Sequence, residues 1–185
     1  MARKETITMQ DILDTAFLMT REEGFENVTA RRVAAKAGCS TQPIFRVYKN
    51  MEELWQAVYD RAVDYFQEYI SRREQTNPVP FVDLGLSYIS FAVEETHLFY
   101  LLFASGAKKT GKKKEMYEIM NGSAGNVVRE ISRAVEMGCK GAESLFIKMW
   151  LFIHGAACMS LIGEFDLSGE EAAKLLAEAY YAFAE

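Results

Sequence analysis

The chain has 185 residues, of which 50% are hydrophobic, and a formal net charge of −5. This composition excludes a disordered tail and is sufficient for one or two compact domains. The acidic balance also excludes a protein that coats nucleic acid indiscriminately. Long helices are possible through most of the chain, because the only three prolines are Pro43, Pro78 and Pro80.

Membrane and export signals are weak in this sequence. No stretch reaches the roughly 18 uninterrupted apolar residues that a membrane span requires. The richest run, Met149–Ile162, contains His154 and Gly155 and is interpreted as a buried core helix. The first residues, Met1–Thr6, have no apolar segment behind their charges, which predicts a cytoplasmic protein. An odd number of cysteines without CxxC spacing indicates reduced thiols rather than a disulfide framework or a zinc site. These are Cys39, Cys139 and Cys158.

Charge is distributed unevenly along the chain. The segment Thr29–Asn50 contains no aspartate or glutamate, and all of its charged residues are cations. These cations are Arg31, Arg32, Lys36, Arg46 and Lys49. A local cationic patch on an acidic protein can hold phosphates at one place while the remaining surface repels them. We therefore expect this segment to bind an anion.

The apolar residues that precede this segment predict a first helix over about residues 8–23. They recur every three or four residues from Met9 to Thr20 and leave charged residues for the opposite face. Gly24 then supplies the left-handed stop that helix ends favour. A short second helix follows, with Thr29 as its N-cap and Ala37-Gly38 at its end.

The turn at Gly38 leads at once into a predicted third helix. Ser40 is its expected N-cap, and Thr41, Gln42 and Pro43 form its first turn. Proline is tolerated there because those amides have no partner within the helix. Two short helices joined by a glycine-containing turn have the spacing of a helix-turn-helix.

The remaining chain is also predicted to be helical. Asn50 and Glu53 have the spacing of a capping box and open a fourth helix that extends to about Arg73. The segment Gln75–Pro80 breaks the pattern and is the expected domain boundary. It is followed by a glycine- and lysine-rich loop, Gly106–Lys114, and by predicted helices at Phe81–Glu95, His97–Ser105, Lys113–Asn121, Ser123–Gly138, Gly141–Gly163 and Gly169–Ala184. No segment alternates as a strand does. The predicted fold is all-α, with a three-helix helix-turn-helix domain at residues 1–50, a linking helix at 50–73 and a second helical domain at 74–185.

Residues 12–54 resemble the tetracycline-repressor (TetR) family of regulators. The residues that carry the resemblance are Ile12, Ala16, Gly24, Phe25, Thr29, Val33, Ala34, Ala37, Gly38, Ser40, Ile44, Phe45, Tyr48, Lys49, Asn50, Glu53 and Leu54. Three positions depart from the pattern: the family usually has lysine where Met51 stands, often has tyrosine at Phe45, and commonly has an aromatic residue or histidine at Val47. Arg46 can compensate, since a guanidinium is a good fork for phosphate.

The resemblance implies that the third helix lies in the major groove of DNA. Gln42 can bond adenine edges, and Thr41 or Pro43 can meet a thymine methyl group. Phe45 can add an apolar base contact. The expected phosphate contacts are Thr29, Arg31, Arg46, Tyr48 and Lys49. Arg3 and Lys4 are expected either to reach a flanking groove or to stay solvated, and Thr41–Pro43 can alternatively serve only as capping residues.

The resemblance also implies that the second domain binds a small molecule and dimerises through the last two long helices. Aromatic and methionine side chains are frequent there and can line an adaptable apolar pocket. The candidates are Tyr88, Phe91, Phe103, Met116, Met120, Trp150 and His154. His154 is the most informative polar candidate, because an imidazole within an apolar helix needs a partner. A core histidine or one at the subunit interface is the alternative.

These features together predict a homodimeric repressor that needs no cofactor or metal and leaves a palindromic operator when a mostly apolar molecule binds. The sequence does not distinguish this repressor from an activator of transcription. The chain has two histidines and none of the GxSxG, HExxH or P-loop motifs, so an enzyme is not predicted. One alternative is a thiol-based redox-responsive regulator with Cys39 or Cys158 as its sensor. Another is a metal- or thiol-dependent helical enzyme that uses His154 and Cys158, which lie one helical turn apart.

Overall fold

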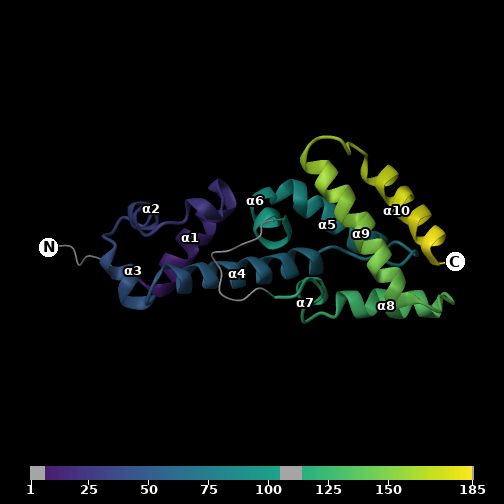
Figure 1. Cartoon of the computed structure of the whole chain (residues 1–185), viewed down its shortest axis with the longest axis horizontal. Helices are drawn as coiled ribbons and strands as arrows, with labels where there is room; N and C mark the ends of the chain where they lie inside the picture. Colours follow the sequence, from purple (N-terminus) through teal and green to yellow (C-terminus); the bar gives the residue numbers. More distant parts are fainter. Residues whose placement is uncertain (1–6, 105–113, 185) are drawn as a thin grey trace. The chain divides into compact units, whose positions relative to one another are not determined.

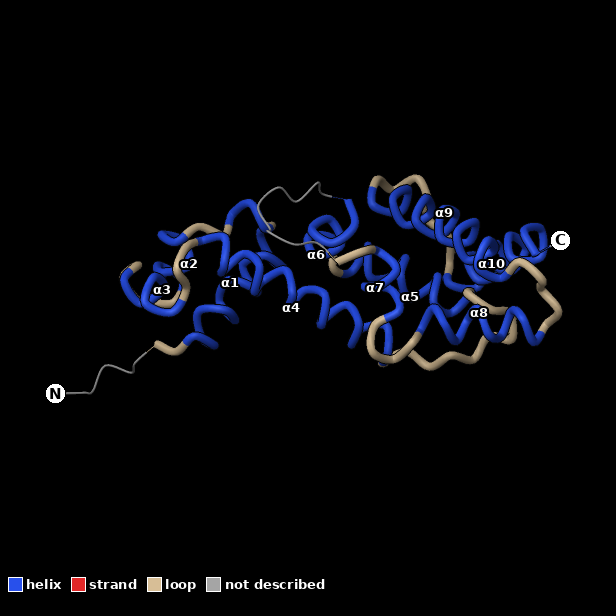
Figure 2. Tube along the Cα trace, turned by 60° about the horizontal axis from the view of Figure 1, so that its bottom comes forward, coloured by secondary structure: helices blue, strands red, loops and turns tan. Residues whose placement is uncertain are grey.

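The computed structural model describes residues 7–104 and 114–184. Every regular element in these ranges is helical and none is a strand (Figure 2), which confirms the all-α prediction. The expected contacts of Arg3 and Lys4, and residues 106–113 of the lysine-rich loop, lie outside the described residues. The described residues divide into two compact units. The first unit lies within Met1–Asp64 and His97–Lys113, and the second unit lies within Tyr65–Thr96 and Lys114–Glu185.

The first unit begins with the three helices that the sequence predicts. They are α1 (Met9–Glu23), α2 (Ala30–Lys36) and α3 (Gln42–Val47), and α1 contacts both of the others (Figure 1). A capping box starts α1, because Thr8 and Asp11 each accept a hydrogen bond from the other's backbone amide, at 3.1 and 2.8 Å. Gly24 ends the helix with a φ of 94°. A short 3-10 turn, η1 (Phe25–Asn27), leads toward α2.

The turn between α2 and α3 requires a left-handed residue, and Gly38 supplies it with a φ of 68°. The expected N-cap of α3 is wrong by one residue. The first helical hydrogen bond runs from the Phe45 amide to the Thr41 carbonyl, so Thr41 is the N-cap and Ser40 precedes the helix. Pro43 then occupies the first turn, as expected.

Helix α4 (Met51–Ser71) begins in the first unit and ends in the second, because the division falls after Asp64. Asn50 caps it by accepting from the Glu53 amide at 2.9 Å. The Glu53 carboxylate accepts instead from the Lys49 amide at 2.6 Å, so only half of the expected capping box forms. The predicted helix at residues 97–105 consists of α6 (Thr96–Phe99) and a π-helical segment, η2 (Tyr100–Ala104), and it packs mainly with the first unit.

Five further helices lie among the described residues of the second unit. They are α5 (Val82–Glu94), α7 (Met116–Asn121), α8 (Asn126–Glu136), α9 (Ala142–Leu161) and α10 (Gly169–Ala184). Helix α5 packs against α9 and α10, and α8 packs against α7 and α9 (Figure 1). Gly85 permits the close approach of α5, since a Cβ there would lie 3.0 Å from side chains of Ile153 and Leu176.

Helix α9 is the one helix among the described residues that is long and apolar enough to cross a membrane. Length and composition alone are weak support for a membrane span, because core helices share them. One side of α9 packs into the second unit through Leu145, Met149 and Ile153, which are buried. This packing agrees with the core-helix interpretation of the sequence.

Candidate functional site

Helix α3 presents one exposed face that carries the residues expected to read bases. Gln42, Phe45 and Arg46 are exposed at positions i, i+3 and i+4, which share one side of a helix. Phe45 is 49% exposed, although a large apolar ring normally avoids water. Ile44 is fully buried and fixes the opposite side of α3 in the core. The helix therefore offers a polar amide, an apolar ring and a guanidinium to the same partner.

The five cations of the acid-free segment divide into two groups. Arg32 forms an ion pair with Glu23, and the Lys36 ammonium lies 2.7 Å from Glu22 and 3.0 Å from Glu23. Lys36 donates hydrogen bonds to both acids, which raises its own pKa, and the bond that Glu23 accepts from Lys36 is the main reason that the pKa of Glu23 is lowered. Arg32 and Lys36 thus connect α2 to α1 and are compensated by its acids.

The other three cations, Arg31, Arg46 and Lys49, are exposed, and their side chains have no acidic partner among residues 7–104 and 114–184. Arg31 and Arg46 lie on α2 and α3, and Lys49 precedes α4. Thr29 lies at the start of α2, where its hydroxyl accepts from the Arg32 amide at 3.4 Å and keeps its own proton for a further acceptor. These residues form an uncompensated cationic surface on the helix-turn-helix.

Tyr48 is not part of that surface. Its side chain is only 1% exposed, and burial raises the pKa of its hydroxyl. The expected phosphate contact from Tyr48 therefore conflicts with the structure, and the ring belongs to the core. The sequence did contain the signal, because Tyr48 lies one helical turn after Ile44 and shares its inward side.

The structure brings together three of the predicted pocket residues in the second unit. A hydrogen bond of 2.9 Å joins the Tyr88 hydroxyl to His154 Nδ1. The Trp150 ring stacks on His154 and meets the edge of Tyr88, with centroids 5.6 and 4.7 Å apart. The Cys158 sulfur lies 3.6 Å from His154 Nε2. Burial raises the pKa of Tyr88 and lowers that of His154, so both side chains are neutral near pH 7.

The other predicted pocket residues are distributed differently. Phe91 is buried and reaches Tyr88 through the intervening ring of Phe66, whose centroid is 4.9 Å from that of Phe91 and 6.1 Å from that of Tyr88. Met120 is buried and Met116 is half-buried, both on α7. Phe103 packs with the first unit. Three open pockets of about 350 to 450 Å³ in the second unit are lined by other residues than these seven candidates.

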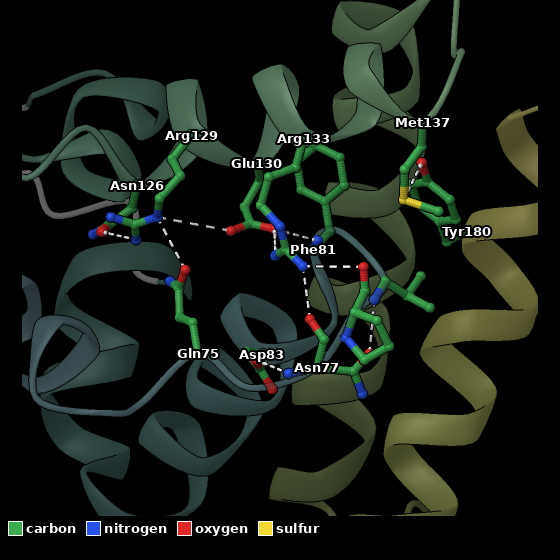
Figure 3. Close-up of polar contacts among 12 residues, drawn as sticks. Gln75, Asn77, Phe81, Asp83, Asn126, Arg129, Glu130, Arg133, Met137 and Tyr180 are labelled. Atoms are coloured by element: carbon green, nitrogen blue, oxygen red, sulfur yellow. Dashed lines mark hydrogen bonds and ion pairs between the residues drawn. The ribbon is translucent and has the colours of Figure 1, made fainter.

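Sequence reasoning missed a buried acid in the second unit. Glu130 on α8 is 1% exposed, and one of its carboxylate oxygens accepts from the Phe81 amide at 2.7 Å and from Arg133 at 2.8 Å (Figure 3). Phe81 has a left-handed φ of 65°. Glu130 lies on the same side of α8 as the buried Val127 and Ala134, so a charge within an apolar stripe was the signal.

The fold and this cationic surface define a class: a helix-turn-helix DNA-binding protein with a second helical domain. Comparison with family models gives two matches. One, described as "Bacterial regulatory proteins, tetR family", covers residues 12–58. The other, "Tetracyclin repressor-like, C-terminal domain", covers residues 81–184. The chain belongs to the TetR family of transcriptional regulators. Members of this family bind DNA, dimerise and carry a ligand-binding C-terminal domain, and they are regulators rather than enzymes.

Solved structures share this fold at low sequence identity. A putative TetR-family transcriptional regulator from Rhodococcus sp. aligns with a TM-score of 0.60 and 18% identity, over 95% of this chain and 98% of that one. RolR without ligand aligns with a TM-score of 0.55 and 15% identity, over 95% and 96% of the two chains. Comparison with curated protein sequences found no match.

Proposed function

We propose that the protein is a cytoplasmic, homodimeric repressor that leaves a palindromic operator when a small molecule binds its C-terminal domain. The observation that carries this proposal is the exposed face of α3, with Gln42, Phe45 and Arg46, next to cations that no described acid neutralises. Glu22 and Glu23 at the end of α1 are occupied by Arg32 and Lys36. The remaining charge is free to meet phosphate.

The contacts divide by chemistry into two sets. Base edges are read from the start and exposed side of α3, by Thr41, Gln42, Pro43 and Phe45. Phosphates are held by Thr29, Arg31, Arg46 and Lys49, and Tyr48 is omitted because it is buried. Only the first set distinguishes one sequence from another, whereas the second set fixes the position of the helix on the duplex.

A second copy of the chain is the proposed partner of the outer face of α9. Ile147, Leu151, Gly155 and Met159 are exposed at four-residue intervals, and Ile162 follows just after the helix. Leu151 is 67% exposed, which is unfavourable for a lone chain in water. Pairing of this stripe about a two-fold axis buries it and places two recognition helices on the two halves of a palindrome.

Induction is proposed to act through α4, because this helix is continuous from Met51 to Ser71 and contributes residues to both units. A mostly apolar ligand that favours one conformation of the second unit shifts the equilibrium between binding-competent and released forms. The polar group that orients such a ligand is His154, held by Tyr88 at 2.9 Å. Any ligand that weakens operator binding must itself bind the DNA complex more weakly by the same factor.

The test of DNA binding separates sequence reading from phosphate holding. An operator is first selected from random duplexes, and affinity is then measured at several salt concentrations. A dimer that neutralises about four phosphates per subunit gives a log–log salt slope of about −7. Arg46→Ala should reduce that slope by about 2 and weaken all sequences together, since each dimer loses the contact twice. Gln42→Ala should mainly relax base preference.

Arg72→Ala is the matched control, because Arg72 is an exposed arginine of the second unit that pairs with Glu68. It removes the same charge from the chain and should leave both slope and preference unchanged. A Gln42→Ala protein with unchanged preference at every base contradicts the assignment of Gln42. Equal effects of Arg46→Ala and Arg72→Ala contradict the phosphate contact.

Thiol-based regulation remains a second candidate, and the structure supports Cys158 rather than Cys39 for it. The Cys158 sulfur lies 3.6 Å from His154 Nε2, so this thiol has a polar neighbour. Operator affinity should then fall after treatment with a thiol oxidant in the wild type and in Cys39→Ser, but not in Cys158→Ser. An unchanged response in Cys158→Ser removes this candidate.

A further inference from the structure

A pocket of about 350 Å³ opens in the second unit where α4 ends and α8 begins. Its polar lining consists of Ser71, Arg73, Gln75, Asn126 and Arg129. Two of these five side chains are guanidinium groups, and no aspartate or glutamate lines the pocket. None of the expected effector-binding residues takes part, so this pocket is distinct from the cluster around His154.

Hydrogen-bond donors outnumber acceptors in this pocket. Arg129 donates through Nε to the Gln75 side-chain oxygen and through Nη2 to the Asn126 side-chain oxygen, each at 2.9 Å (Figure 3). Each carboxamide oxygen thereby already accepts one hydrogen bond, and both NH₂ groups remain as donors. Among the described residues, the Ser71 hydroxyl is likewise without an acceptor. A ligand that satisfies this lining must supply acceptors.

The two arginines differ in how acids compensate them. Arg73 pairs with Glu94 at 3.0 Å, outside the pocket lining, and also donates to Tyr69 and Ser90. The nearest acid to Arg129 is Glu130, 3.9 Å from its Nε, and Glu130 makes a shorter contact of 2.8 Å with Arg133. Three arginines thus share two carboxylates, and the excess positive charge lies where Arg129 meets the pocket.

We propose that this pocket binds the carboxylate of a small organic acid. A guanidinium presents paired N–H donors that match the two oxygens of a carboxylate. Ile70 and Ala124 complete the lining and provide apolar surface for the remainder of the molecule. The volume of about 350 Å³ falls within the range of about 300 to 1,000 Å³ for small-molecule sites. A small organic acid is thus a ligand class for the C-terminal domain. Its role as an effector, but not its binding, rests on the proposed function.

Calorimetric titration of the full-length protein with benzoate, without DNA, tests the proposal directly. Benzoate should bind saturably at one site per chain, whereas benzamide, a neutral molecule of the same shape, should not. Phenyl phosphate is the second arm. If it binds at least tenfold more tightly than benzoate, the site is a phosphate site and the carboxylate assignment is wrong. Absence of saturable benzoate binding also overturns the proposal.

Variants locate the site. Arg129→Gln should weaken benzoate binding about tenfold, as expected for the loss of a charge-assisted hydrogen bond. Arg73→Gln should also weaken benzoate binding, and it provides a second test of the site if Arg129→Gln does not fold. Arg72→Gln is the matched control, since Arg72 precedes Arg73 but does not line the pocket. Equal affinity in Arg129→Gln and Arg72→Gln, or full affinity in both pocket variants, overturns the proposal.

The two proposals fail separately in these experiments. Benzoate binding is measured without DNA, so its absence leaves the operator assay and the repressor proposal unaffected. A protein that binds benzoate but no operator would overturn the repressor proposal and retain the organic-acid site.

Discussion

Removal of the buried carboxylate of Glu130 should strongly destabilise the second unit. Glu130→Ala deletes the oxygen that accepts from the Phe81 amide at 2.7 Å and from Arg133 at 2.8 Å. A buried amide without a partner costs about 1–3 kcal/mol. Breaking a fully buried ion pair costs about 3–5 kcal/mol. Arg133 is 27% exposed and would still donate hydrogen bonds to the carbonyls of Asn77 and Pro78. The cost of breaking the ion pair is therefore smaller here.

The expected loss in free energy of unfolding is therefore about 3 kcal/mol. Release of Phe81 from its left-handed backbone, which itself carries strain of about 1 kcal/mol or more, limits the loss. For a chain of this length, each kcal/mol corresponds to roughly 2–4 °C in Tm, which gives a decrease of about 6–12 °C. Thermal unfolding followed by circular dichroism measures it.

Two further variants make this measurement specific. Glu136→Ala removes an exposed acid from the same helix and should change stability by less than about 0.5 kcal/mol. Glu130→Gln keeps the shape and one acceptor oxygen, so its Tm should lie between those of the wild type and Glu130→Ala. If Glu130→Ala melts within about 2 °C of Glu136→Ala, the carboxylate does not hold the Phe81 segment as argued.

Three other predictions concern the turn, the dimer and pH. Gly38→Ala should cost about 1–2 kcal/mol in urea unfolding, because the alanine Cβ is strained at a φ of 68°; an unchanged midpoint would show that the turn relaxes freely. Leu151→Asp should convert a dimer into the 21.0 kDa monomer in sedimentation, and persistence of the dimer would place the interface elsewhere. Because burial lowers the pKa of His154, the unfolded chain takes up that proton first, and wild-type stability should decrease as the pH falls through about 6.5, the ordinary pKa of histidine. His154→Gln should lessen that fall, and equal pH profiles would contradict the role of His154.

The helices were predictable because their signals are local. Thr8 and Asp11 are three residues apart, and Gly24 and Gly38 mark the points where the backbone must turn left-handed. Such signals act within one or two helical turns and can be recognised without knowledge of the packing. The position of α3 was missed by one residue, because Ser40 and Thr41 are both suitable caps and the choice depends on how the turn packs.

The parts that sequence reasoning missed depend on contacts between distant segments. Lys36 is separated by 13 and 14 residues from the two acids that compensate it, and Glu130 by 49 residues from the amide that it accepts. The free and the compensated cations of the acid-free segment therefore look alike in the sequence. The family resemblance implies a phosphate contact from Tyr48, whereas the side chain of Tyr48 is buried in the core, as is that of Ile44.

The two tryptophans of the chain lie in different units, which gives each unit its own optical reporter. Trp55 belongs to the first unit, where its indole N–H donates to the Val28 carbonyl at 2.8 Å and its ring meets Phe25. Trp150 belongs to the second unit and stacks on His154. Indole emission follows the polarity of its surroundings, so Trp55→Phe leaves a signal from the second unit alone and Trp150→Phe a signal from the first. Occupancy of the two units by DNA and by an effector can thus be recorded separately in an unlabelled protein.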